Sequence, residues 1–415
     1  MTRDPPAALR RGQRLMLGLL LLAGVTNYVD RVALSVANPL IRADLHLSVG
    51  QMGVLLSAFL WAYALAQLPV GALVDRLGPR RLLAGALVLW SGAQAAAGAA
   101  GGLGAFAAAR MALGIGEAPQ FPVGARVVAA WFAPKDRGFA TGVFNSASTI
   151  GPAIAPPLVT LLMLSLGWRA AFGLMGAAGL VVAAVWWTLY RDRRATSPEG
   201  GDAPAPETLT LAVWERLFAA PTLWGMILGN FGSGYMNWFY AAWLPGYLEI
   251  ERHVSVPKTG WLAAVPYVFG VFGSLIGGWT CDALARRGLA PIASRKLPIV
   301  GGLIAGAAFT ALAIIAPENR SAIACVCAAV FASNFAGAAI WALALAAAPH
   351  RAVASVGGAQ NFGGLMGGAL APIVTGFTVQ ATHSFASALA ITAAIGVGGA
   401  LTYLFGVRHP IADPG

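Results

Sequence analysis

The sequence predicts an all-α polytopic membrane protein, with twelve membrane-spanning helices arranged as two related six-helix halves. Three observations predict this fold class. Charged residues are scarce, apolar stretches long enough to cross a bilayer recur along the whole chain, and one short charged motif occurs at the same place in each half.

The composition excludes a water-soluble domain. Of 415 residues, 58% are hydrophobic and 10% are charged, whereas a soluble domain carries roughly 25% charged residues. Twelve spans of about 20 residues need about 240 mostly apolar positions, which is close to the hydrophobic content of this chain. The three cysteines and five histidines follow no disulfide, zinc or haem spacing, so we expect no cofactor and no metal.

Twelve apolar stretches are separated by glycine, proline and charged residues. The first carries Asp30 and Arg31 and lacks a small-residue cleavage site, which favours a retained span over a signal peptide. The predicted spans are 15–38, 52–72, 82–101, 103–125, 138–162, 170–190, 221–246, 259–280, 297–316, 321–346, 354–377 and 384–406.

The basic residues follow these spans. Twenty of the 27 Lys and Arg residues lie in the termini and the even-numbered loops, five lie in the odd-numbered loops and two lie inside spans. By the positive-inside rule both termini are cytoplasmic, and the net charge of +11 needs no nucleic-acid partner. The polar stretch from Arg191 to Glu215 predicts a linker. We therefore expect an N-terminal bundle at 1–190, a cytoplasmic linker at 191–220 and a C-terminal bundle at 221–415.

A charged motif occurs in both halves. After the second span, Gly71 precedes Asp75 by four residues, and after the eighth span Gly278 precedes Asp282 in the same way. We expect each glycine to let neighbouring spans approach, and each aspartate to cap a helix end or pair with arginines at the cytoplasmic face. The residues assigned to this motif are Gly71, Asp75, Arg76, Gly78, Arg80, Asp282 and Arg286.

This motif resembles the loop signature of the major facilitator superfamily, Gly-x-x-x-Asp-Arg-x-Gly-x-Arg-Arg. The resemblance implies two pseudo-symmetric six-helix bundles around a central cavity, with a substrate site near the middle of the membrane and transport by alternating access. It also implies a transporter rather than an enzyme, and no Ser/His, metal or phosphate-loop pattern favours a membrane enzyme or receptor.

Four ionisable side chains lie inside the predicted spans, away from their ends: Asp30, Arg31, Arg110 and Glu117. Each is costly alone in lipid, so we expect them to face one another or a wet cavity. Asp30 and Arg110 lie at similar depths and are expected to pair, while Glu117 lies two turns further along the face of Arg110. Proton uptake by the two acids would couple transport to a proton gradient; the alternative is a set of static ion pairs between helices.

Arg31 points about 100° away from Asp30 around the helix. We interpret it as the anchor for a substrate carboxylate, because a guanidinium group binds a carboxylate with two parallel hydrogen bonds.

The runs Asn27 to Arg31 and Arg110 to Pro119 resemble the anion:cation symporter family, whose bacterial members transport galactonate, hexuronates and glucarate. The resemblance implies proton binding at Asp30 and Glu117, coupling through Arg110, and a carboxylate held by Arg31. It also implies a sugar-acid site lined by Tyr28, Tyr63, Ser148, Trp341 and Asn361.

Ser148 departs from the glutamine of the galactonate-type members, which favours an anion other than galactonate. The predicted function is proton-coupled uptake of an organic anion, most simply a hexonate, hexuronate or aldarate. The alternatives are another carboxylate, such as an aromatic acid or a monocarboxylate, or efflux by proton antiport. We expect a monomer in the lipid bilayer of a bacterial inner membrane, with a small organic anion as its partner.

Overall fold

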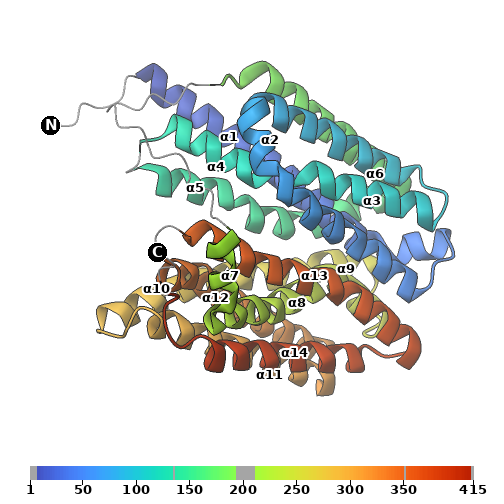
Figure 1. Ribbon diagram of the computed structural model, residues 1–415. Helices are drawn as coiled ribbons and strands as arrows, with labels where there is room; N and C mark the ends of the chain where they lie inside the picture. The colour runs from blue at the N-terminus through green and yellow to red at the C-terminus, as the bar shows by residue number, and fades with distance from the viewer. Residues whose placement is uncertain (1–6, 134–135, 193–210, 350–351, 413–415) are drawn as a thin grey trace. The chain divides into compact units, whose positions relative to one another are not determined.

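In the part of the chain that the computed structural model describes, residues 7–133, 136–192, 211–349 and 352–412, every regular element is a helix (Figure 1). The predicted all-helical fold class is therefore confirmed. The chain forms two compact units, Met1–Leu47 with Ala58–Gly201, and Ser48–Ser57 with Asp202–Gly415. Each unit is described by itself below.

Six helices of the described residues belong to the first unit, apart from the start of α2 up to Ser57, which belongs to the second. They are α1 (Ala7–Asp44), α2 (Val49–Gly98), α3 (Leu103–Glu117), α4 (Gln120–Trp131), α5 (Arg137–Asn145) and α6 (Ala147–Leu189). Helix α1 packs along α6 and also contacts α4 and α5. This places α1, which carries two of the four intramembrane charges, among several neighbours.

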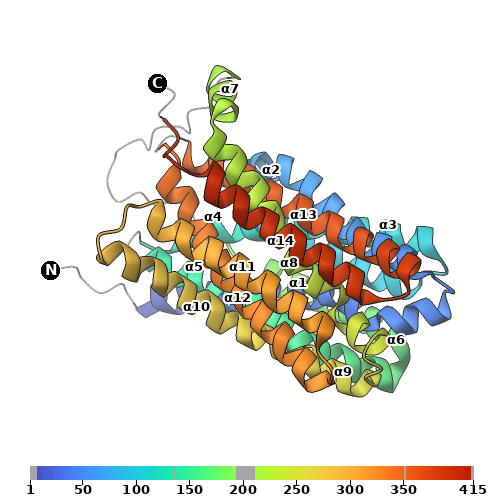
Figure 2. The same ribbon diagram turned by 90° about the horizontal axis from the view of Figure 1, so that it is seen from below.

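Eight helices of the described residues belong to the second unit. They are α7 (Leu211–Ala219), α8 (Pro221–Ile250), α9 (Val256–Leu262), α10 (Val265–Arg286), α11 (Ala293–Ile315), α12 (Asn319–Ala347), α13 (Val353–Thr382) and α14 (Phe385–Gly406). Helix α8 packs against α13 and α14, while α12 packs against both α10 and α11 (Figure 2). Two α13 glycines make the first contact possible, since a Cβ added at Gly363 or Gly367 would meet the α8 backbone.

Eight helical segments among the described residues are long and apolar enough to cross a membrane. Two of them, Val49–Gly98 and Arg137–Leu189, are 50 and 53 residues long, which is about twice the length that a bilayer needs. Each bends at a glycine with positive φ, at Gly78 (φ 74°, ψ 159°) and at Gly167 (φ 78°, ψ 157°). Each of these two long segments can supply two spans, so the eight segments supply ten. The pair α3 and α4 supplies one more, and the more polar α8 supplies another, which is consistent with twelve spans.

Three predicted spans are interrupted. The fourth is divided into α3 and α4, because Pro119 lacks the N–H that would continue the hydrogen-bond ladder. The fifth begins as α5 and continues as α6, and the eighth is divided into α9 and α10. The predicted linker also contains a helix, α7, and residues 193–210 of that linker lie outside the described residues.

The loop motif agrees with the prediction in part: Asp75 pairs with an arginine, but the two glycines do not pack closely against a described residue. A Cβ added at Gly71 or Gly278 would meet no atom within 4 Å, so neither glycine serves close packing in this structure. Asp75 lies 3.8 Å from Arg126 in an ion pair whose side chains are 70% and 59% exposed, and such exposed pairs contribute little to stability. Among the described residues, neither Asp282 nor Arg286 forms an ion pair.

The bend at Gly78 is held by the next residues of the motif. The Arg80 guanidinium donates to the Trp187 carbonyl at 2.7 Å, and the Trp186 indole N–H donates to the Arg80 carbonyl at 3.1 Å. The Arg80 backbone N–H also donates to Asp192, 3.2 Å away. Arg80 therefore joins the bend of α2 to the end of α6, whereas Arg76 makes no contact of this kind with any residue that the structure describes.

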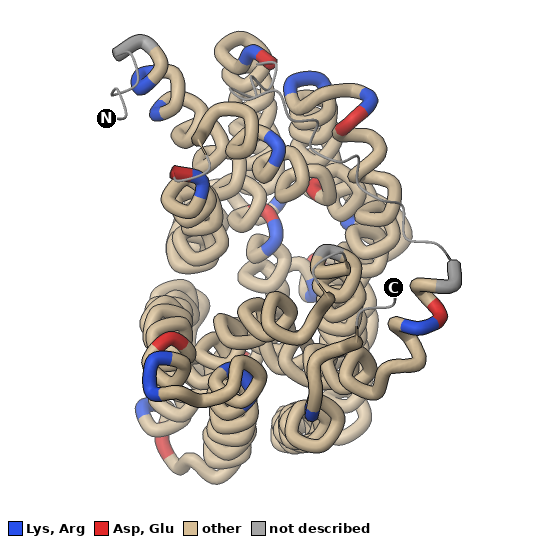
Figure 3. Tube along the Cα trace, turned by 60° about the vertical axis from the view of Figure 1, so that its left-hand side comes forward, with Lys and Arg blue, Asp and Glu red and all other residues tan. Residues whose placement is uncertain are grey.

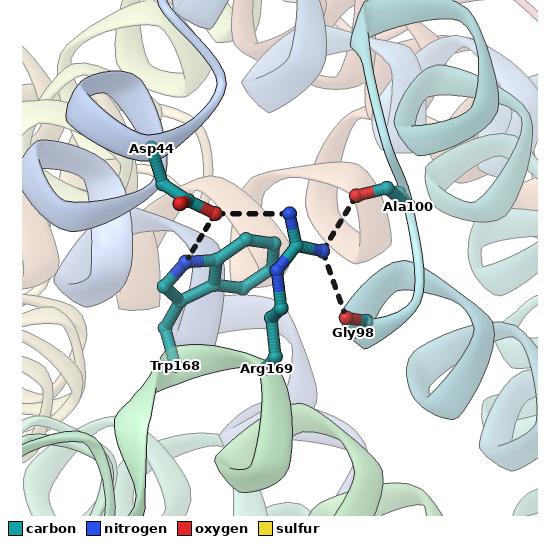
Figure 4. A network of polar contacts seen from close by, with 5 residues as sticks. All are labelled: Asp44, Gly98, Ala100, Trp168 and Arg169. Carbon is teal, nitrogen blue, oxygen red and sulfur yellow. Dashed lines mark hydrogen bonds and ion pairs between the residues drawn. The ribbon is translucent and has the colours of Figure 1, made fainter.

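A second network joins the C-terminal ends of α1 and α2 to α6 (Figure 4). Arg169 donates to the carbonyls of Gly98 and Ala100 at 3.2 and 2.7 Å and pairs with Asp44 at 2.9 Å. Trp168 donates its indole N–H to the same carboxylate at 3.2 Å. The left-handed bend at Gly167 precedes both residues, and Arg169 thereby satisfies carbonyl groups that the end of α2 leaves open.

Candidate functional site

The four intramembrane charges meet inside the first unit. Asp30 and Arg31 lie on α1, and Arg110 and Glu117 lie on α3. Asp30, Arg110 and Glu117 are at most 2% exposed, and the Arg31 side chain is 7% exposed. Most of the other charged residues on the described helices lie near helix ends and connections (Figure 3). These four residues are therefore exceptional by position and burial.

Two glycines bring α3 close to α2 beside these charges. A Cβ added at Gly114 would meet the Phe59 carbonyl, and one added at Gly116 would lie 2.8 Å from the Trp90 backbone nitrogen. Because the sequence places Gly114 and Gly116 just before Glu117, the helix can lie directly against α2 where the acid emerges. Glu117 is the last residue of α3, immediately before the break at Pro119.

The strongest contact in the site is an ion pair between Arg31 and Glu117. The Arg31 Nε donates to Glu117 Oε2 at 2.6 Å. The sequence placed both residues in the site but did not predict that they pair. A fully buried charge is tolerated only when it is paired and hydrogen-bonded, so this contact compensates the burial of both groups.

The predicted Asp30–Arg110 ion pair is not formed. Arg110 Nη1 instead lies 3.5 Å from the backbone carbonyl of Asp30, at the limit of a hydrogen bond. Among the described residues, Asp30 Oδ2 and Arg110 Nε are buried without hydrogen-bond partners. The depth argument placed the two residues near each other, but the side-chain directions leave the carboxylate without its partner.

Aromatic rings surround the Arg31 guanidinium. Its Cζ lies 4.9 Å from the Tyr28 ring centroid, 5.1 Å from Phe59 and 4.8 Å from Tyr63. Phe59 also lies 5.2 Å from Arg110 Cζ and stacks on Tyr63 at 5.7 Å. Rings at these distances attract a cation through their faces and fix its position. The predicted residues Tyr28 and Tyr63 thus lie beside the predicted carboxylate anchor.

Three residues of the site were missed from the sequence. Phe59 contacts both arginines. Its position one helical turn before Tyr63 could have indicated that it faces the same site. Asn27 and Gln120 are at most 1% exposed, and neither side-chain amide hydrogen-bonds to a described residue. Buried amides without partners are costly, so they mark a place where a polar ligand can bind. Asn27 begins the segment Asn27 to Arg31, which carries the family resemblance, so the sequence could have indicated it. Nothing in the sequence marks Gln120 as a site residue.

The remaining predicted substrate residues divide between the units. Ser148 on α6 is exposed and lies beside the Tyr28 hydroxyl, with its own hydroxyl donating to the Asn145 carbonyl at 2.7 Å. Trp341 on α12 is 61% exposed, and Asn361 on α13 is half-buried. The last two belong to the second unit.

The arrangement suits reversible binding of a proton and an anion. Two acids and two bases leave the cluster without net charge, and adding a proton to either acid makes it net positive. Arg31 Nη2 and Glu117 Oε1 have no hydrogen-bond partner among the described residues, so both groups keep capacity for a ligand. In the same part of the chain, no three His, Cys, Asp or Glu side chains are placed to hold a metal ion.

The chain is similar to known transporters along almost its whole length. The chain is 43% identical to a probable L-galactonate transporter of Escherichia coli K12, over 98% of this chain and 92% of the relative. It is 33% identical to a D-galactonate transporter of Escherichia coli O6:H1, over 96% and 97% of the two chains.

A solved structure shares the fold. An inward-facing, occupied crystal structure of a bacterial homologue of the human lysosomal transporter Spinster matches with a TM-score of 0.81 and 20% identity, over 96% of this chain and 98% of that one. The family model of the Major Facilitator Superfamily matches residues 20–372. The predicted family resemblance is thereby confirmed: the chain belongs to the Major Facilitator Superfamily of membrane transporters.

Proposed function

We propose that this protein is a proton-coupled symporter that takes up a sugar acid of the hexonate type. The observation that carries the proposal is the buried Arg31–Glu117 ion pair, with Asp30 and Arg110 beside it. The names of the galactonate-transporting relatives support the substrate class. We also propose a monomer in a bacterial inner membrane with both termini cytoplasmic, based on the distribution of Lys and Arg.

The ion pair supplies a way to couple the two ligands. While Glu117 is ionised, it occupies the Arg31 Nε at 2.6 Å. A proton on Glu117 removes its charge, weakens the pair and leaves the guanidinium to a substrate carboxylate. Proton binding and anion binding then favour each other, and this coupling is reciprocal by thermodynamic linkage. Asp30 provides a second protonation site, and Arg110 lies between the two acids.

The sugar hydroxyls need donors and acceptors as well. Asn27, Gln120, Tyr28 and Ser148 supply these in the first unit, and in the proposal Trp341 and Asn361 supply them from the second. The similarity to the L-galactonate relative weighs against the expectation, drawn from Ser148, of an anion other than galactonate. L-Galactonate is therefore the first compound to test.

The experiment is uptake into proteoliposomes that contain the purified protein, with labelled L-galactonate. An inward proton gradient should drive accumulation by the unchanged protein, and a protonophore should abolish it. Glu117→Gln keeps a side chain of the same size that still accepts a hydrogen bond from Arg31. This variant should lose proton-driven accumulation and keep exchange of internal for external substrate.

The matched control is Glu318→Gln, since this acid is exposed and lies outside the site. It should accumulate substrate like the unchanged protein. If Glu117→Gln still concentrates L-galactonate against a gradient, Glu117 is not the coupling group. Multidrug efflux is the less favoured alternative because arginines in the site disfavour cationic substrates, and accumulation driven only by an outward proton gradient would establish export.

A further inference from the structure

A large apolar groove lies within the second unit, and none of its lining residues belongs to the charged cluster. Its volume is about 860 Å³, and it is lined by residues of α9, α10, α11 and α12. Helix α12 packs along both α10 and α11, whereas α10 and α11 contact each other much less (Figure 2). The groove therefore opens between α10 and α11, with α12 as its floor.

The sequence explains why this space stays open. On one side, Cβ atoms added at Gly273 or Gly277 of α10 would meet the α12 backbone, and on the other side Gly302 of α11 lies equally close to it. The helices thus approach closely, and the floor between them includes the small side chains of Ala324, Ala328 and Ala332, which fill little of the space. Phe269 and Phe309 stand at the rim and are 45% and 37% exposed.

One end of the groove is charged. Arg320, in the first turn of α12, is the only ionisable side chain among the lining residues apart from the buried thiol of Cys327. It is exposed, and no described residue pairs with it or accepts a hydrogen bond from it. The neighbouring acid, Glu318, directs its carboxylate to the backbone N–H of Ser321 in a capping box. Arg320 is thus a cation at one end of the apolar groove, without an ion-pair partner among the described residues.

The other arginines of the predicted odd-numbered loops are used differently. Arg252 donates to the carbonyls of Ala316 and Ala313 at 2.9 and 2.8 Å, and so closes the end of α11. Arg169 and Arg42 also donate to backbone carbonyls. Arg320 has no such structural role, although it lies close to the same connection.

The dimensions fit one class of occupant. From Arg320 to Phe335 the groove follows α12 for about 22 Å at 1.5 Å per residue, which exceeds half of a hydrocarbon core about 30 Å thick. A groove of this kind along membrane-spanning helices can receive a lipid, and a phospholipid combines an apolar chain with an anionic headgroup. We propose that the groove binds an acyl chain of an anionic phospholipid whose phosphate pairs with Arg320. With both termini cytoplasmic, this lipid comes from the outer leaflet.

The test is native mass spectrometry of the purified full-length protein with equal amounts of phosphatidylglycerol and phosphatidylethanolamine. The unchanged protein should retain phosphatidylglycerol in preference, by roughly fivefold if Arg320 supplies a single surface-type contact. Arg320→Gln should retain the two lipids equally. If Arg320→Gln still prefers phosphatidylglycerol as strongly as the unchanged protein, Arg320 does not bind the lipid phosphate.

Groove filling tests the acyl chain. A Cβ at Gly301 points into open space and lines the groove, so Gly301→Leu should fill it and reduce retention of both lipids. Gly398→Leu is the matched control, because its Cβ also meets no atom but it lies on α14, outside the groove. Ala305→Leu provides a second filling variant, and thermal unfolding establishes that each variant is folded. Retention unchanged in folded Gly301→Leu and Ala305→Leu would overturn the proposal.

Discussion

At the scale of single residues, the site depends on one buried ion pair surrounded by rings. Arg31 contacts Glu117 at 2.6 Å and three aromatic faces at about 5 Å. Glu117 is completely buried. Removing one member of such a pair leaves an uncompensated buried charge, whereas replacing both members with neutral side chains leaves no buried charge.

Arg31→Gln should therefore destabilise the protein by about 3 to 5 kcal/mol. The double variant Arg31→Gln with Glu117→Gln should recover most of this loss but should not transport, because the carboxylate anchor is absent. Thermal unfolding of the purified proteins measures the first effect, and uptake measures the second. Arg287→Gln, which alters an exposed arginine without an ion-pair partner, is the control. A double variant as unstable as Arg31→Gln would contradict the argument.

At the scale of helices, a few residues determine where the chain bends. Gly78 has φ 74° and ψ 159°, a conformation that is essentially restricted to glycine. Pro119 interrupts the fourth span directly after Glu117. The bends place Arg80 against α6 and Glu117 at a helix end, so local backbone chemistry positions both residues.

Gly78→Ala should cost about 1 to 3 kcal/mol, because alanine is strained in this conformation. Gly85→Ala on the same helix is the control, since its Cβ would meet no atom and its backbone is helical, while a Cβ at Gly78 would make only ordinary contact with the Asp192 side chain at 3.4 Å. The control should be neutral or slightly stabilising. Thermal unfolding of both variants gives the comparison, and equal stability of the two would refute the proposed strain.

The network of Figure 4 gives a second prediction for helices. Arg169→Ala should cost about 1 to 3 kcal/mol, since it removes the donor to the carbonyls of Gly98 and Ala100. Asp44→Asn should cost less than about 1 kcal/mol, because the ion pair is half exposed and the amide oxygen still accepts from Trp168. If Asp44→Asn proves the more damaging change in thermal unfolding, the ion pair rather than the carbonyl capping holds these helices.

At the scale of the whole molecule, the distribution of charge determines how the chain lies in the membrane. The five cations of the odd-numbered loops contrast with twenty in the termini and even-numbered loops. The proposed topology places Ala290 in the cytoplasm and Pro317 outside. Both residues are exposed and lie in connections between helices.

Single cysteines at these two positions test this topology. In a background with Cys281, Cys325 and Cys327 changed to alanine, Pro317→Cys should react with a membrane-impermeant maleimide on intact cells. Ala290→Cys should react only after the membrane is permeabilised. The reverse pattern would invert the topology.

The sequence by itself determined the fold class, the family and the membership of the charged cluster. Scarce charges, long apolar stretches and a repeated loop motif are local properties, and a charge in lipid must find a partner whatever the details of packing. For that reason Asp30, Arg31, Arg110 and Glu117 could be grouped before any coordinates.

Only the tertiary structure decided which of these residues pair. Arg31 rather than Arg110 binds an acid side chain, because Gly114 and Gly116 set the distance between α3 and α2 and Pro119 ends α3 at Glu117. The unpartnered amides of Asn27 and Gln120, the open space at Gly71 and the groove over α12 also depend on contacts between distant segments. Helical periodicity gives the depth of a side chain in the membrane and the helix face on which it lies. Which other side chain it contacts is decided only when the helices pack.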